Sequence, residues 1–164
     1  MNTDRIEKQV LLRAPLARVW QAITDSAQFG AWFGVALDGP FVAGAKLGGR
    51  IVPTTVDAEV ARMQEPHKGT AFTIEVDCIE PMHRFSFRWH PYAIEAGADH
   101  ASEPMTLVEF TLVQTAGGVQ LTISESGFDR IPLARRADAF QANEGGWAIQ
   151  TTLIAKYLDQ ATQR

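Results

Sequence analysis

The sequence predicts an α+β protein in which a curved antiparallel sheet of about six to seven strands wraps around one long C-terminal helix. Apolar and polar residues alternate through most of the middle of the chain, as they do in half-buried strands. Helical spacing is confined to two short segments near the N-terminus and one long segment at the C-terminus. Because no helix separates most of the strands, they form an antiparallel meander whose apolar face the long helix covers.

The N-terminal segment is predicted to be a strand followed by two short helices. Residues 6–13 form the strand, because their apolar side chains share one face. Pro15 opens the first helix, since proline is tolerated in a first turn, and residues 16–23 have the spacing of a half-buried helix. Asp25 and Ser26 are suited to cap the second, shorter helix, which Gly34 ends.

The middle of the chain is predicted to consist of strands and turns. Residues 39–49 contain turns and short strands, and residues 53–69 form a polar connection. Four strands of the meander follow, at residues 72–78, 85–89, 108–112 and 119–123. Cys78 alternates in phase with Phe72, so we expect a buried structural thiol. The connection from Pro91 to Pro104 is long for a hairpin and is a candidate lid over a cavity.

The C-terminal segment predicts one long amphipathic helix. Its stripe consists of residues spaced four and three apart: Leu133, Ala137, Phe140, Glu144, Trp147, Thr151, Ile154 and Leu158. Inside it, Gly145 and Gly146 each weaken the helix by about 1 kcal/mol relative to alanine. Glycine at a helix centre usually has a packing or functional reason. We therefore expect a cavity between this helix and the sheet.

Composition predicts a single domain spanning residues 1–164 and excludes several classes of partner. The net charge is −4 and the 15 basic residues are scattered, so we expect no nucleic-acid partner. The N-terminus lacks an apolar signal region, and no apolar run is long enough to insert into a membrane. A single cysteine fits a reducing compartment, and we expect a cytoplasmic protein.

Short motifs along nearly the whole chain resemble those of one superfamily. They are Pro15 with Val19-Trp20 and Ala22-Ile23-Thr24, Trp32-Phe33-Gly34, residues 85–91, Glu125-Ser126-Gly127-Phe128, residues 143–147 and Tyr157-Leu158. Together they resemble the SRPBCC (START-like) superfamily and, within it, the C-terminal domain of the activator of heat-shock protein 90 ATPase. The resemblance implies a helix-grip fold with a deep pocket between the long helix and the sheet. The superfamily hosts lipid carriers, hormone receptors, cyclases and oxygenase subunits on this scaffold.

Two carboxylates are candidates for polar groups in that pocket. Glu125 shares the parity of the apolar residues in its strand, and Glu144 lies on the helix stripe. Facing one cavity, the pair could act as acid and base or receive a polar ligand group. The alternative is that Glu125 turns outward at a bulge and that Glu144 sits at the wet edge of the stripe, paired to an arginine.

The remaining candidates favour binding of a small apolar or amphipathic molecule. The predicted ligand-binding residues are Trp32, Phe33, Phe72, Phe85, Phe87, Trp89, Glu125, Phe140, Glu144 and Trp147. The histidines lack zinc-ligand spacing, the glycines lack the context of a phosphate-binding loop, and no serine lies in a nucleophile elbow. We therefore expect neither metal nor cofactor. A cyclase, dehydratase or isomerase in the same cavity and a chaperone-regulating interaction domain are the alternatives, and a homodimer stays open.

Overall fold

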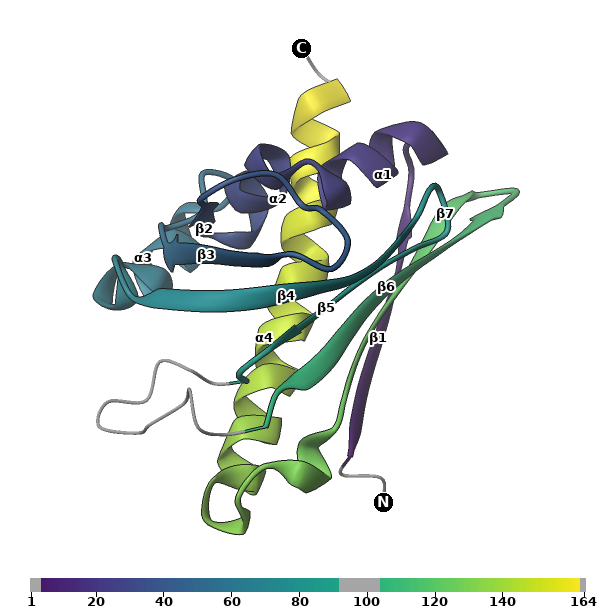
Figure 1. The fold of residues 1–164 in the computed structure, drawn as a ribbon. Coiled ribbons are helices and arrows are strands. Elements are labelled where there is room, and N and C mark those ends of the chain that lie inside the picture. The colour runs from purple at the N-terminus through teal and green to yellow at the C-terminus, as the bar shows by residue number, and fades with distance from the viewer. Residues whose placement is uncertain (1–3, 92–103, 163–164) are drawn as a thin grey trace.

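The computed structural model describes residues 4–91 and 104–162, which form a seven-stranded antiparallel sheet curved around a long helix (Figure 1). The strand order is β1-β7-β6-β5-β4-β3-β2. The elements are β1 (Arg5–Leu12), α1 (Leu16–Thr24), α2 (Ser26–Phe33), β2 (Val35–Leu37), β3 (Lys46–Ile51), α3 (Ala58–Gln64), η1 (Glu65–His67), β4 (Ala71–Glu80), β5 (Arg84–Trp89), β6 (Thr106–Thr115), β7 (Gly118–Ser126), η3 (Phe128–Arg130) and α4 (Leu133–Thr162). The predicted helix-grip class is thereby confirmed.

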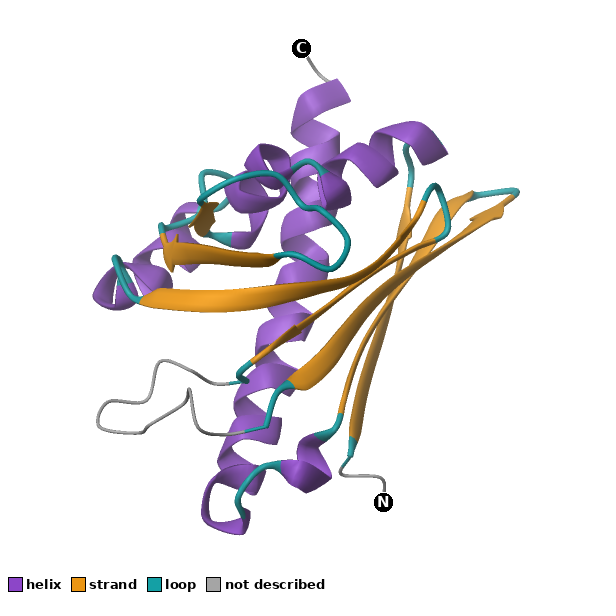
Figure 2. Cartoon of the chain, in the orientation of Figure 1, coloured by secondary structure: helices purple, strands orange, loops and turns teal. Residues whose placement is uncertain are grey.

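Helices cover one side of the curved sheet, with α4 running along its concave face and α1 and α2 beside the C-terminal half of α4 (Figure 2). No helix in the described part of the chain is long and apolar enough to cross a membrane. The candidate lid between Pro91 and Pro104 falls on residues 92–103, which lie outside the described residues.

The two N-terminal helices begin and end as their sequence predicts. The Asp25 carboxylate accepts hydrogen bonds from the backbone N–H groups of Ala27 and Gln28, at 3.0 and 3.1 Å, and so caps α2. Gly34 ends α2 with a φ of 99°, a left-handed conformation that favours glycine. This turn sends the chain directly into β2, which pairs with the C-terminal half of β3.

The polar connection predicted at residues 53–69 is wrong, because this segment contains α3 and η1. The Asp57 carboxylate caps α3 by accepting hydrogen bonds from Glu59 N and Val60 N, each at 3.0 Å. The helix is only seven residues long, none of them fully buried, and its partly buried Val60 is too little to form the apolar stripe that predicts a packed helix. Its cap was the signal available in the sequence.

A β-bulge in β4 overturns the predicted position of Cys78. Val76 pairs with Phe87 and Cys78 pairs with Ser86, which leaves Asp77 as an extra residue. The phase of the strand therefore changes, and Cys78 moves to the outer side of the sheet. Its thiol is half-buried there, with Sγ 3.8 Å from Nη2 of Arg84.

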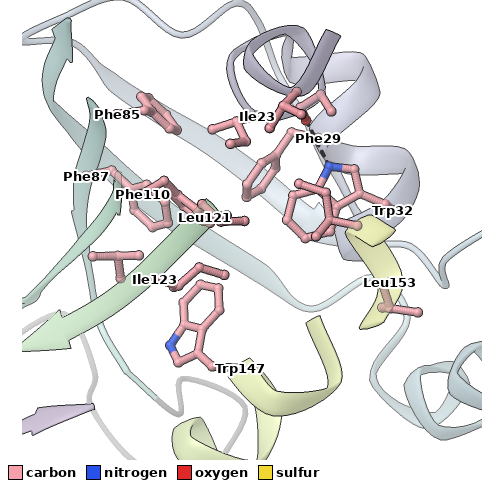
Figure 3. Packing of buried hydrophobic residues seen from close by; sticks show 14 of the residues in the cluster. Ile23, Phe29, Trp32, Phe85, Phe87, Phe110, Leu121, Ile123, Trp147 and Leu153 are labelled. Carbon is pink, nitrogen blue, oxygen red and sulfur yellow. Dashed lines mark hydrogen bonds between the residues drawn. The ribbon is translucent and has the colours of Figure 1, made fainter. Parts of the chain in front are cut away.

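The core lies between the concave face of the sheet, α2 and the C-terminal half of α4 (Figure 3). Phe29 from α2 packs edge-on against Trp32 and Phe110, with ring centroids 5.0 and 6.1 Å apart. The predicted stripe of α4 holds from Trp147 onward but fails before it, where Leu133 is 78% exposed. In the early turns of α4, Phe140 packs against Phe128 of η3 with ring centroids 5.2 Å apart, so the burial pattern there follows a different neighbour.

Candidate functional site

A cavity of about 360 Å³ opens where α4 separates from the β2 end of the sheet. Its wall is formed by the α2–β2 junction, α3, η1, the adjacent ends of β3, β4 and β5, and the middle of α4. The apolar part of this wall includes Phe33, Val60, Met63, Phe72, Trp89 and Ile149. The polar part consists of Gln64, His67, Thr70, His90, Asn143 and Gln150. Among the described lining residues there is no lysine, arginine, aspartate or glutamate.

Gly146 keeps the helix side of this cavity open. It lines the cavity, and a Cβ atom placed on it would meet nothing within 4 Å. Gly145 has equally open surroundings but is exposed and does not line the cavity. The neighbouring Trp147 is buried on the sheet side of the helix. The space beside the helix is therefore empty at Gly146 and filled by a side chain at the next residue.

Polar contacts hold α3 opposite α4 and so define the outer wall. The side chain of Gln64 donates from Nε2 to the carbonyl oxygen of Phe33 at 3.1 Å and accepts from Thr54 N at 2.8 Å. Lys156 Nζ on α4 lies 2.9 Å from Oδ2 of Asp57, the cap of α3. The hydrogen bond from the Val60 N–H, followed by that from Lys156, lowers the pKa of the Asp57 carboxyl below its usual 3.8.

Glu125 is fully buried directly behind the cavity wall. One carboxylate oxygen accepts hydrogen bonds from Trp89 Nε1 at 2.7 Å and Thr106 Oγ1 at 2.5 Å. The other accepts from Asn143 Nδ2 and Trp147 Nε1, each at 2.8 Å. Strand β7 stays regular up to this residue, so Glu125 does point inward as its parity predicts. It does not line the cavity, yet it orients Trp89 and Asn143, which do.

The structure divides the ten predicted ligand-binding residues among several environments. Those that line the cavity are Phe33, Phe72 and Trp89. Those that belong to the buried core are Trp32, Phe85, Phe87 and Trp147, whereas Phe140 packs against Phe128. Their aromatic character predicted that they point inward. It did not predict whether each one packs in the core or lines the cavity, because the curvature of the sheet decides where the core ends.

Glu144 departs from its prediction most clearly. It is exposed on α4 and does not line the cavity. Its place on the predicted stripe rested on Leu133 and Ala137, which are themselves exposed. The face of α4 that meets the cavity instead carries Asn143, Gly146 and Gln150, beside the stripe that is buried from Trp147 onward. Two carboxylates therefore do not face one cavity.

The prediction also missed residues that do line the cavity. Asn143 and Gln150 are two of them. With Gly146, from which the cavity was predicted, they recur at steps of three and four, so the three residues share one helix face. That spacing was present in the sequence, beside the apolar stripe. The α3 residues Val60 and Gln64 had no such signal, since their segment was predicted to be a connection. Within residues 4–91 and 104–162, no three histidine, cysteine, aspartate or glutamate side chains cluster as a metal site.

A curved antiparallel sheet that grips one long helix, with a cavity beside the helix, defines a helix-grip protein of the SRPBCC superfamily. The chain belongs to the family described as Activator of Hsp90 ATPase homolog 1-like protein, whose model matches residues 13–159. The resemblance seen in the sequence is thereby confirmed. Proteins of this fold family often bind small hydrophobic ligands.

Solved structures share the fold over almost the whole chain. DynU16, a protein in the dynemicin biosynthetic locus, is 28% identical with a TM-score of 0.67, covering 96% of this chain and 48% of that one. This chain thus spans about half the length of DynU16. MLL2253 from Mesorhizobium loti is 21% identical with a TM-score of 0.69, covering 95% of this chain and 97% of that one. A protein from Arthrobacter aurescens is 16% identical with a TM-score of 0.72, covering 96% and 87%. No curated protein matches the chain.

Proposed function

We propose that this protein binds a small, largely apolar molecule in the cavity between α3, α4 and the β2 end of the sheet. The observation that carries the proposal is Gly146, a helix-weakening residue that faces open space in the cavity wall. A volume of about 360 Å³ lies in the range of known small-molecule sites. Aromatic and aliphatic side chains with a few polar groups are the usual composition of such sites.

Binding has better support than acid–base catalysis in this cavity. The two histidines, His67 and His90, are the titratable groups of its described wall. Glu125 is the nearby carboxylate, but both of its oxygens already accept two hydrogen bonds each. A general base needs hydrogen-bond reach to the proton that it removes, and Trp89 and Asn143 stand between Glu125 and the cavity.

The relatives agree with a small-molecule ligand without naming it. DynU16 belongs to a biosynthetic locus, which is in keeping with such a ligand. A chaperone-regulating role has the family description as its support. Ligand binding is supported in addition by the volume and the lining of a cavity in this chain itself, and for this reason we favour it.

An uncharged environment-sensitive dye, N-phenyl-1-naphthylamine, tests the proposal. Its fluorescence is expected to rise on mixing with the native protein and to saturate. Gly146→Leu fills the cavity, so dye affinity is expected to fall by about tenfold or more, the loss expected when apolar contact is replaced by overlap. The melting temperature is expected to stay level or rise, because leucine favours the helix by up to about 1 kcal/mol over glycine.

Gly145→Leu is the matched control for this experiment. It makes the same change one residue away, at an exposed position outside the cavity. It is expected to give the same gain in helix propensity with unchanged dye affinity. Equal dye affinity in the two variants would contradict the proposed function. So would the absence of any fluorescence increase with the wild-type protein.

A further inference from the structure

Glu125 is a buried carboxylate that no cation neutralises. Its four hydrogen-bond donors are two indoles, one amide and one hydroxyl, none of which carries a charge. Each oxygen accepts from an indole N–H, which can only donate, so the group acts as a carboxylate on both sides. It forms no ion pair with any residue in the described part of the chain. Neutral donors solvate a buried charge without cancelling it, so the site keeps a net negative charge.

Two of these donors bring the effect of the charge into the cavity wall. Trp89 and Asn143 both line the cavity while they donate to Glu125, at 2.7 and 2.8 Å. Because the Asn143 nitrogen faces the carboxylate, the negative end of this amide is the one turned away from Glu125. The indole of Trp89 is polarised in the same sense, since it donates to an anion, and its ring becomes more electron-rich. Both groups thus add negative charge density to the wall.

No positive side chain in the described wall opposes this charge. Lysine and arginine are absent from the described lining residues, and the Lys156 ammonium on α4 pairs with Asp57. The exposed charges of residues 58–68 balance, with two acidic and two basic side chains. The lining groups of His67, His90 and Thr70 can each donate and accept when uncharged, so they favour neither sign of ligand. The field of an unpaired charge therefore persists in the low-dielectric cavity.

Aromatic rings form the apolar wall beside these groups. Phe33, Phe72 and Trp89 line the cavity, and the ring centroids of Phe33 and Trp89 lie 6.0 Å apart with their planes tilted by 59°. An aromatic face attracts a cation that lies within about 6 Å of the ring centroid, and tryptophan attracts it most strongly. A neutral molecule of the same shape gains neither this attraction nor that of the carboxylate.

Resting on the proposed function, we propose that the ligand of this cavity is an organic cation, with an ammonium group on an apolar frame. The ammonium group lies against the aromatic wall, Trp89 included, and Glu125 is its counter-charge behind that wall. Glu125 is then a positioning residue, which acts through Trp89 and Asn143 without touching the ligand. Binding of the cation offsets part of the cost of burying an unpaired carboxylate. The same potential rejects anions.

Three probes of nearly equal size and shape test the sign of the charge. Phenyltrimethylammonium, tert-butylbenzene and benzenesulfonate carry a cationic, an uncharged and an anionic group on one benzene ring. The quaternary ammonium has no hydrogen to donate, so its preference reports charge alone. Each probe competes with N-phenyl-1-naphthylamine at low salt and at about pH 8, where histidine is normally neutral. In the wild-type protein the cation is expected to bind about tenfold more tightly than tert-butylbenzene, and the anion more weakly than either.

Trp89→Phe tests where the cation lies. Phenylalanine keeps an aromatic ring, but it attracts cations less strongly and cannot donate to Glu125. The ratio of the cation and tert-butylbenzene affinities is expected to fall by about threefold or more, whereas purely structural damage would weaken both probes alike. Trp20→Phe is the matched control, because Trp20 is buried in α1 and does not line the cavity. It is expected to keep the wild-type ratio. Thermal melts confirm that both variants are folded.

Equal affinities of the cation and tert-butylbenzene in the wild type would overturn the inference, and so would a ratio that Trp89→Phe leaves unchanged. These results leave the proposed function in place, because the uncharged dye reports the cavity itself. A wild-type protein that gives neither a dye response nor a calorimetric signal with phenyltrimethylammonium would overturn both proposals.

Discussion

At the scale of single residues, the hydrogen bonds of Glu125 require a glutamate, and the similar side chain of glutamine cannot replace it. Each of its oxygens accepts a hydrogen bond from a tryptophan indole, from Trp89 on one side and Trp147 on the other. An indole N–H can only donate. Glutamine in place of Glu125 would turn its own NH₂ group toward one of these indoles in either orientation. The position therefore needs two acceptor oxygens.

We predict that Glu125→Gln lowers the free energy of unfolding by about 2 to 4 kcal/mol, since it removes charge-assisted hydrogen bonds and leaves a buried donor unpaired. Glu144→Gln, at an exposed position on α4, is expected to stay within about 0.5 kcal/mol of wild type. Urea titrations followed by far-ultraviolet circular dichroism measure both. A Glu125→Gln protein as stable as wild type would show that the four donors do not depend on a carboxylate.

At the scale of elements, α3 packs the partly buried Val60 against the core and is otherwise positioned by polar contacts. None of its residues is buried, and its position opposite α4 is held by Gln64 and by the pairing of Asp57 with Lys156. Exposed ion pairs are individually weak, so the cap and the pair act together with the glutamine. The outer wall of the cavity is consequently an element whose attachment responds to charge.

We predict that the stabilising effect of Asp57 disappears at low pH. Hydrogen bonds from Val60 N and Lys156 lower the pKa of this carboxyl in the folded protein below the 3.8 expected without them. The folded protein therefore binds fewer protons than the unfolded chain in this range, and stability rises with pH. The contribution is fully present above about pH 3.8 and is lost as pH falls through the lowered pKa.

Asp57→Asn isolates this effect, because asparagine still caps a helix but cannot pair with Lys156 as a carboxylate. Urea titrations of both proteins between pH 2 and pH 6 measure the difference in unfolding free energy, a range chosen to bracket the usual pKa of about 3.9 for aspartate. This difference is expected to shrink as pH falls below about 3.8. A difference that stays constant over the whole range would show that the lowered pKa does not contribute to stability.

At the scale of the whole molecule, the sheet is filled at one end and open at the other. The β1, β7 and β6 end packs against the buried face of α4 and the rings carried by α2, whereas the β2 end faces the cavity. A molecule in the cavity would contact α2, α3, α4 and the sheet at once. Binding should therefore be linked to global folding rather than to one loop.

We predict that N-phenyl-1-naphthylamine raises the free energy of unfolding in proportion to the logarithm of its concentration. At 100 times the dissociation constant the gain is about 2.7 kcal/mol, because the dye binds the folded state alone. Calorimetric melts at several dye concentrations measure this gain. In Gly146→Leu the gain at the same dye concentration is expected to fall to about 1.4 kcal/mol or less, because the dye binds about tenfold more weakly or worse. A melting temperature that falls as dye is added would instead indicate binding to the unfolded chain.

Local patterns in the sequence determined the fold class, the two N-terminal helices, the meander and the inward direction of Glu125. Each depends on spacing within a few residues, since a strand alternates and a helix repeats whatever its distant neighbours are. The cavity was also predicted from a local feature, the pair of glycines in the long helix. The sequence alone therefore predicted the scaffold and a cavity beside its long helix.

The tertiary structure decided which side chains form that site. The bulge at Asp77 reversed Cys78, α3 supplied a wall from a segment without an apolar stripe, and Glu144 turned outward. The aromatic residues were divided between core and cavity by the curvature of the sheet, which places Phe87 inside and Trp89 at the cavity. These outcomes depend on contacts between segments far apart in the chain, and the free energy of such contacts leaves no periodic pattern in the sequence of either segment.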